Sequence, residues 1–373
     1  MSTNTINSTK FSNFAINQYT TMKPRHFLLT GFLAATVLLL NSCASTNGVT
    51  MEVLVPANIT VPSTIKKVAV VNRSLPAKGD GFVNFLEGFI TGEAIHADKD
   101  ASNKCIGSLV NKLNLAPRFG AVLVNYPQLK GTGTREWPLP LSWTMVDSIC
   151  KMYKSDALVA LETFDSDFLF DKGKNLLKQK TAHGADTIVT EYFANFKVNV
   201  NAGWRVYDDI NKKVLDEQNF TDVKAWLKKG ATPEAVLSQL PDKRDAINAA
   251  GLFAGDQYGM RISPTWENVY RNYYVRGKKE VGFKNAKKFV RLKKWDQAVI
   301  IWTNLSKSTD TKIAGRANYN LALASEMDGD LDKALSFATI ARDTYGVRPA
   351  AYYVNQINAR IADQARLKQQ LGK

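Results

Sequence analysis

The stretch Ile65–Arg73, IKKVAVVNR, decides the fold of the first half of the chain. Its β-branched residues form a compact apolar run, too short for an ordinary helix and bounded by turn formers, so it predicts a buried strand. Five further segments follow: two helical patterns over 82–90 and 106–113, a strand over 119–124, a helix over 146–153 and a strand over 156–161. This alternation predicts a parallel or mixed sheet with right-handed crossovers, covered by helices.

The pattern changes between Ile188 and Phe220, where apolar and polar residues alternate as in antiparallel strands. A turn over Asp208–Asn211 leads into Lys213–Asp216, which predicts a hairpin added to the sheet. This order of elements resembles the periplasmic α/β domain of the TolB amino-terminal region and of the curli-secretion and penicillin-binding-protein-activator lipoproteins. The matching segments are Val68–Val71, Phe119–Val122, Asp156–Val159 and Arg205–Asp208. An insert over Gly131–Pro140 departs from those families, so their partner surfaces are not carried over.

Residues 23–43 have the layout of a signal peptide: basic Lys23-Pro24-Arg25-His26, an apolar run over Phe27–Leu40, and small residues before Cys43. The run is shorter than the roughly 20 residues that a transmembrane helix needs. Leu40-Asn41-Ser42-Cys43 resembles the lipobox of bacterial lipoproteins, which implies that the Cys43 thiol receives diacylglycerol, with palmitate among its acyl chains. The alternative is an ordinary signal peptide with a chance cysteine.

Residues 1–21 lie ahead of Met22, which we interpret as the true start. Ala44-Ser45-Thr46-Asn47-Gly48 follows Cys43 without an acidic residue. By resemblance to the sorting signals of other lipoproteins, this predicts an outer-membrane anchor that faces the periplasm, although surface exposure stays open.

The second half shows a doubled helical pattern with a spacing of 36 residues. In each copy two alanines lie 12 residues apart, Ala286 with Ala298 and Ala322 with Ala334, as two closely packed helices require. The pattern resembles tetratricopeptide repeats, with ordinary core packing as the alternative. A capping helix is expected over 349–370. The residues expected to pack the repeats are Ala286, Phe289, Trp295, Ala298, Trp302, Ala322, Ala334 and Ala338.

An aromatic segment and a basic segment at the start of the second half can each be interpreted in two ways, as structural or as functional. Trp266–Tyr274 is expected to be an aromatic helix face that either joins the domains or forms a ligand platform. The basic run over 276–294 is either a solvated helix face or a surface that contacts anionic headgroups. The residues proposed for that contact are Lys278, Lys279, Lys287, Lys288 and Arg291.

The sequence offers little that predicts catalysis. The chain has three histidines, none at metal-binding spacing, so we expect no metal and no cofactor. Asp165, Asp167 and Asp171 alternate with phenylalanines in what we interpret as a strand end or loop, either a solvated face or the carboxylates of a hydrolase. Cys105 and Cys150 are expected to be small buried residues, with a disulfide as the alternative.

The net charge of +15 favours anionic surfaces, and for a secreted protein these are lipids, not nucleic acid. As a whole the chain resembles Bacteroidales lipoproteins with tetratricopeptide repeats. The predicted fold class is α+β: an upstream segment and signal peptide (1–42), an anchored linker (43–60), a mixed α/β sheet domain (61–225), linking helices (226–280) and an all-α repeat domain (281–373). We expect a lipid-anchored envelope adaptor, not an enzyme, that binds a protein or peptide partner on its repeats. The alternative is a subunit of an oligomeric secretion or channel assembly, and the sequence leaves the oligomeric state open.

Overall fold

The computed structural model describes residues 45–75, 92–126, 129–132, 135–277 and 280–372. Cys43, the signal peptide and the helical pattern predicted over 82–90 lie outside these ranges, as do Lys278 and Lys279.

A five-stranded mixed sheet forms the core of the first half. Its strands, in spatial order, are β3 (Gly120–Val124), β2 (Lys67–Asn72), β4 (Ala157–Lys180), β5 (Asp186–Asp208) and β6 (Lys213–Gly230). β2 pairs in parallel with β3 at one edge and with β4 at the other. Its apolar run is buried on both faces, because helices cover both sides of the sheet. β5 and β6 add on antiparallel. The predicted α+β class, mixed sheet and added hairpin are confirmed.

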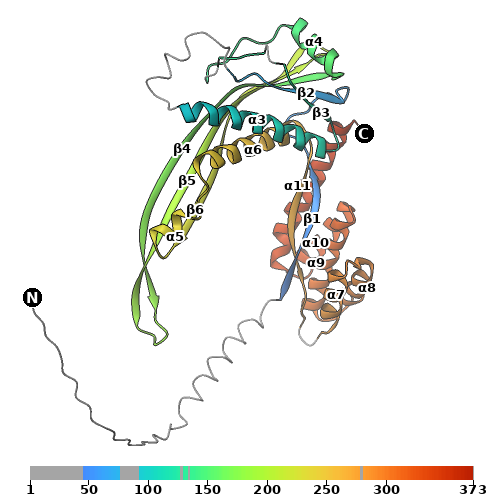
Figure 1. The fold of residues 1–373 in the computed structure, drawn as a ribbon. Helices are drawn as coiled ribbons and strands as arrows, with labels where there is room; N and C mark the ends of the chain where they lie inside the picture. Colours follow the sequence, from blue (N-terminus) through green and yellow to red (C-terminus); the bar gives the residue numbers. More distant parts are fainter. Residues whose placement is uncertain (1–44, 76–91, 127–128, 133–134, 278–279, 373) are drawn as a thin grey trace, which may run out of the picture.

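Helices cover both faces of this sheet (Figure 1). One face packs on α3 (Gly92–Leu115) and α6 (Lys243–Ile262), and the other on α4 (Trp143–Tyr153). α3 and α6 pack closely because α6 presents a stripe of glycines to α3. A Cβ at Gly251 would lie 2.5 Å from the Ala101 carbonyl oxygen, and one at Gly255 would clash with that of Cys105. Cys105 and Cys150 are buried free thiols, as predicted.

β4 and β5 continue far beyond the sheet core, and with β6 they form a projecting three-stranded blade (Figure 1). We define the blade as residues 163–180, 186–203 and 219–230. The prediction that the third strand ends at Leu161 is therefore wrong. The placement of Asp165, Asp167 and Asp171 at a strand end or loop is also wrong, because they alternate along β4 and point to its polar face. The short helix α5 (Pro233–Leu237) and α6 pack on the opposite, apolar face.

Two predictions around the linkers are wrong. Residues 46–55, expected in a linker, form β1 (Thr46–Val55), and residues 265–274, expected in a helix, form β7 (Thr265–Tyr274). The two strands pair antiparallel, which we call the ribbon. The aromatic spacing of 266–274 fits both periods, and pairing with a strand more than 200 residues earlier decides for the extended form. The strands also do not stop at Trp226, since β6 runs to Gly230.

Residues 282–371 form helices joined by short connections, as predicted. The helices are α7 (Gly282–Arg291), α8 (Trp295–Leu305), α9 (Thr311–Met327), α10 (Leu331–Asp343) and α11 (Arg348–Leu371). Each predicted copy is one pair of packed helices, α7 with α8 and α9 with α10. A tight turn at Gly329, with φ of 84°, joins the second pair. The tetratricopeptide assignment itself stays a prediction.

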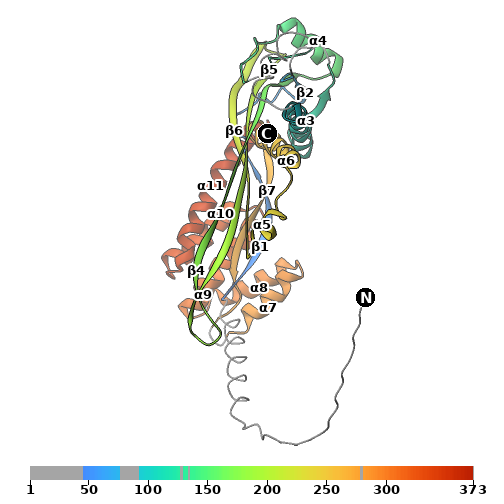
Figure 2. The ribbon, with the colours of Figure 1, turned by 60° about the vertical axis from the view of Figure 1, so that its left-hand side comes forward.

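The parts form an arch in which the blade is one leg and the ribbon with its helices is the other (Figure 1). Figure 2, turned about the vertical axis, shows both legs reaching the same end of the molecule. α11 ties the second leg to the segment after β1, because the Gln370 side chain accepts from the Ala57 amide at 2.9 Å and donates to its carbonyl at 2.9 Å.

Candidate functional site

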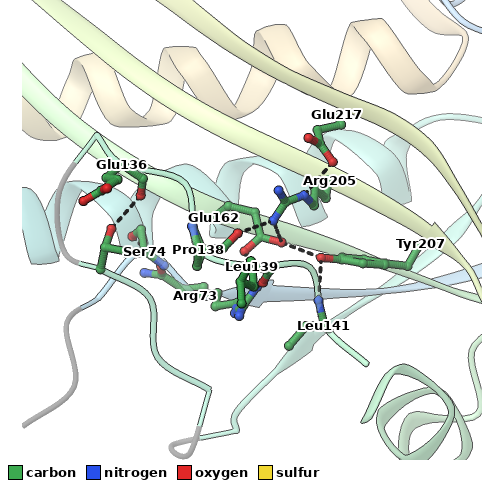
Figure 3. Close-up of polar contacts among 12 residues, drawn as sticks. Arg73, Ser74, Glu136, Pro138, Leu139, Leu141, Glu162, Arg205, Tyr207 and Glu217 are labelled. Atoms are coloured by element: carbon green, nitrogen blue, oxygen red, sulfur yellow. Dashed lines mark hydrogen bonds and ion pairs between the residues drawn. The ribbon is translucent and has the colours of Figure 1, made fainter. Parts of the chain in front are cut away.

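A buried charge cluster lies at the carboxyl end of β2, at the point where β4 continues beyond its parallel pairing with β2 (Figure 3). Glu162 of β4 is fully buried and accepts hydrogen bonds from Arg73 Nη1 at 2.8 Å and from the Tyr207 hydroxyl at 2.7 Å. Arg205 of β5 lies 3.4 Å from the same carboxylate and also binds Glu217 at 2.8 Å. Ligands of many α/β proteins bind beyond the carboxyl ends of parallel strands, so the cluster lies where a ligand-binding site is expected.

The cluster holds a loop instead of opening to solvent. Arg205 Nη1 donates to the Pro138 carbonyl and Arg73 Nη1 to the Leu139 carbonyl, both at 2.8 Å. The Leu141 amide donates to the Tyr207 hydroxyl at 3.2 Å (Figure 3). The loop that departs from the resembled families is thus fastened across the strand ends.

Burial and the Glu162 charge raise the pKa of Tyr207, so its hydroxyl stays a donor. Burial alone would lower the pKa of Arg205, but Glu217 and Glu162 raise it. The Arg205 guanidinium is therefore held in its ionised form by its two glutamate neighbours, as in a structural network.

A second cluster of the same composition lies in the helical half. Glu326 of α9 has a fully buried side chain and accepts from Arg271 Nε at 3.0 Å, from Arg360 Nη1 at 2.7 Å and from the Tyr353 hydroxyl at 2.6 Å. Burial would raise the pKa of Glu326, but the hydrogen bonds from Arg271, Tyr353 and Arg360 outweigh it and lower the pKa. This cluster joins β7, α9 and α11.

The second cluster borders a cavity of about 440 Å³ between the ribbon and the helices, which we call the ribbon cavity. Arg271, Glu326 and Arg360 lie on its wall. Its remaining lining mixes acidic and apolar residues, including Glu52, Asp328, Asp363, Met51, Trp266, Val269, Met327 and Leu367. Trp266 is half exposed there.

A smaller cavity of about 310 Å³ lies in the crook of the arch, where β5, β6 and α6 meet the ribbon. The rings of Trp204 and Tyr258 stack in its wall with centroids 4.4 Å apart. Asp222 also lines it, and burial raises the pKa of this carboxyl to about 6. Neither cavity was predicted from sequence, because each is lined by segments distant in the chain.

The predicted packing residues all lie in the core of the helical half. Ala286, Ala298, Ala322, Ala334 and Ala338 are fully buried, as is Trp302. Phe289 and Trp295 are partly buried against the same core. The ribbon belongs to this core too, since Tyr273 packs against Trp302 and Asn320 of α9 hydrogen-bonds the Tyr274 backbone in both directions at 2.7 Å. One face of α9 is therefore already covered by β7.

The remaining predicted residues are at the surface. Lys288 and Arg291 of α7 are exposed and Lys287 is half buried. Arg135 bridges Asp165, at 2.6 Å, and Asp167, and Asp171 is exposed. Within the described part of the chain, His, Cys, Asp and Glu do not gather into a group that could hold a metal ion. In the same part, no helix is long and apolar enough to cross a bilayer.

A family model matches residues 65–274, from the first strand of the sheet core to the end of the ribbon. The chain belongs to this family, described as a domain of unknown function (DUF8603). A second model, also described as a domain of unknown function (DUF6340), matches residues 284–361 of the helical half. No curated protein matches the chain in sequence.

Several solved structures show a weak likeness. The PelC dodecamer from Paraburkholderia phytofirmans is 10% identical and covers 58% of this chain and 99% of its own, with a TM-score of 0.20. A minor lipoprotein from Acinetobacter baumannii is 13% identical, covers 54% and 99%, and has a TM-score of 0.19. Lipoprotein B from Nitrosomonas europaea is 10% identical, covers 53% and 81%, and has a TM-score of 0.18. Two of the three are described as lipoproteins. TM-scores this low do not show a shared fold.

Proposed function

We propose that the protein is a lipid-anchored adaptor of the cell envelope that binds an extended segment of a partner protein in the ribbon cavity and catalyses no reaction. The observation that carries the proposal is the cavity itself, which has a half-exposed tryptophan and an acidic rim. A large ring beside polar groups is the usual anchor of a protein interface. The rim carboxylates Glu52, Asp328 and Asp363 favour a partner segment with basic and apolar residues.

The ribbon changes where a partner can bind. A peptide was expected on the face of the repeats, but β7 occupies one face of α9. The partner therefore has to enter beside the ribbon, where Trp266 and Met327 meet Leu367 of α11.

The proposed absence of catalysis is supported by the pairing of four carboxylates. Glu162 and Glu326 are each held by two arginines and a tyrosine, and Asp165 and Asp167 share Arg135. A general acid or base needs room for a substrate at its proton. These carboxylates are already paired with side chains of the protein itself.

Lipid attachment at Cys43 and an outer-membrane, periplasm-facing position remain part of the proposal, on the resemblance of residues 40–43 to a lipobox and on the residues that follow. Labelled fatty acid should be incorporated into the wild-type chain and not into Cys43→Ser. Equal membrane association of both chains would remove the anchor from the proposal.

The adaptor role is tested by placing a photo-crosslinking amino acid at position 266 in intact cells, with position 352 on α11 as the exposed control site. We expect a discrete adduct from position 266 only. Asp328→Lys should abolish it because the rim loses a carboxylate, whereas Asp332→Lys, exposed on α10 outside the cavity, should keep it. Identical adducts at both sites, or insensitivity to Asp328→Lys, would contradict the proposal.

An oligomeric envelope assembly is the second candidate, favoured by the long strand edges of the blade. In the described residues, no strand pairs with the outer edge of β6. Within the same residues, the outer edge of β4 is also unpaired after Leu161, where its pairing with β2 ends. Such edges readily pair with another chain. Asp171→Cys combined with Leu227→Cys, two exposed positions on the same face and in the same row of the blade, should give intermolecular disulfides if blades pair edge to edge, and only monomers otherwise. The buried Cys105 and Cys150 make little background.

A further inference from the structure

The blade ends in a two-stranded tip that carries apolar side chains on both faces. β6 ends at Gly230 opposite Tyr192, so residues 175–180 and 186–191 extend alone, for about 20 Å at roughly 3.3 Å per residue. Leu176 and Ile188 are 66% and 64% exposed on one face, and Leu177 and Val189 are 37% and 39% exposed on the other. The hollow between α5 and the blade is lined by residues 172–174 and 192–194, which precede the tip on β4 and follow it on β5.

Exposed lysines follow the strand that leads into the tip. Lys172 and Lys174 lie just before the tip and Lys178 and Lys180 lie in it, and we call these four the tip lysines. The acidic residues over 172–191 are Asp186 and Glu191, and Glu191 is paired with Lys229 at 2.8 Å. Long lysine stems can lie along apolar surface while their ammonium groups stay at a polar boundary. Exposed apolar residues with interleaved lysines suit the boundary between anionic headgroups and acyl chains.

The tip also lies at the end of the molecule where the anchor has to be. Figures 1 and 2 place the turn of the β4–β5 hairpin and the first residue of β1 at the same end of the long axis, in views 60° apart. Cys43 precedes Thr46 by three residues, so an acylated Cys43 is within about 10 Å of β1 at the length of an extended chain. The membrane therefore meets the molecule at this end.

Helix α7 adds a second basic surface at that end (Figure 1). Lys284, Lys288 and Arg291 are exposed on it. The two legs of the arch thus each carry exposed cations at the end of the molecule where the anchor is proposed, while the acidic rim of the ribbon cavity lies elsewhere on the ribbon.

From these observations we propose that the blade tip docks in the interface of the anionic membrane to which the chain is anchored, with α7 as a second contact. The protein would then stand on three points, the acyl chains, the tip and α7, and hold the inside of the arch open above the bilayer. This inference rests on the proposed lipid anchor.

The test uses the full lipidated chain, with an environment-sensitive dye on Ile188→Cys and, as the matched control, on Ile210→Cys. Ile210 is 52% exposed and lies in the β5–β6 turn beside α4, at the far end of the blade. Reconstituted into phosphatidylcholine vesicles containing phosphatidylglycerol, the dye at 188 should shift to shorter wavelength, and the dye at 210 should not. Changing the four tip lysines to glutamine should abolish the shift while flotation with the vesicles is kept.

The outcomes separate the two proposals. If the chain fails to float with vesicles, the anchor is wrong. If the chain floats but the emission of the dye at 188 does not shift, the tip inference is overturned and the anchor stands. The same holds if the emission shifts as much in pure phosphatidylcholine vesicles and in the variant without the four lysines. A shift that is present before vesicles are added would show contact between copies of the chain and would also overturn it.

Discussion

The two halves of the molecule use the same device, a buried glutamate held by two arginines and a tyrosine, for different ends. The Glu162 cluster draws its members from adjacent strands and seals a loop over them, with Arg205 only 5% exposed. The Glu326 cluster joins a strand to two helices and opens on the ribbon cavity, where Arg360 is 22% exposed. One network therefore fixes a local loop, and the other fixes how the ribbon meets the helices.

The largest effect is expected for Glu162→Ala. It leaves Arg73 and Arg205 in the interior without their carboxylate, and breaking a buried pair costs about 3–5 kcal/mol. Urea unfolding measures the loss. Glu234→Ala, at an exposed position on α5, is the control and should stay within about 0.5 kcal/mol. A loss below about 1 kcal/mol would show that the loop relaxes and lets water reach the arginines.

Glu326→Ala should cost less, near the lower end of that range at about 3 kcal/mol, because Arg360 can turn to solvent. Its pKa is lowered, so its stabilisation is present above the ordinary carboxyl pKa and is lost as pH falls through the lowered value. Hydrogen exchange should rise in β7 and α11 but not in β2. Exposed Glu267→Ala on the same strand is the control, and a uniform rise across both halves would contradict the comparison.

The halves also differ in how helices approach each other, by glycine in one and by alanine in the other. Gly255→Ala pushes a methyl group into the Cys105 carbonyl and should cost about 1–3 kcal/mol. Gly107→Ala on the partner helix has no described atom within 4 Å of the new Cβ and should stabilise by about 0.5–1 kcal/mol. Thermal unfolding of the pair should shift in opposite directions, and equal shifts would mean that α3 and α6 are not in close contact.

Asp222 tests a buried carboxylate of another kind, because burial raises its pKa to about 6. The folded chain then holds the proton more tightly than the unfolded chain, so stability falls as pH rises from about 4 to about 6 and stays lower above that. Asp222→Asn should gain stability relative to wild type across this window. Urea midpoints at several pH values measure it, with Asp171→Asn at an exposed position as control. A pH-independent difference would rule out the shifted carboxyl.

The smallest effect is expected for Asp165→Asn with Asp167→Asn. Their ion pairs with Arg135 are at the surface, with Asp167 58% exposed, and should contribute below about 1 kcal/mol. If the double variant kept its stability but no longer supported a cellular function that the wild-type protein supports, a catalytic role for the pair would be favoured instead.

Much of the sheet core could be predicted from sequence, because β2, β3 and the start of β4 are short apolar runs whose periodicity is local. The blade could not be predicted from the sequence. Its aspartates and lysines resemble a loop, and only pairing with β5 and cover from α6 show that they form the polar face of a strand. The charge clusters were also missed, since Glu162 and Arg205 lie inside strand patterns and their partners lie in other elements. An isolated charge within an apolar run, such as Glu162 after Ala157–Leu161, is the signal that could have found them.

The sequence by itself determined the strand–helix order of the first half, the two alanine-packed helix pairs and a basic chain with a lipobox-like cysteine near its start. These depend on residue type and on spacing within one element. Only the tertiary structure decided that residues 46–55 and 265–274 form a ribbon, that two glutamates are buried, and that the blade tip and the start of β1 share one end. Each of these depends on contacts between segments far apart in the chain, and no local pattern encodes which distant segment satisfies a strand edge or a buried charge.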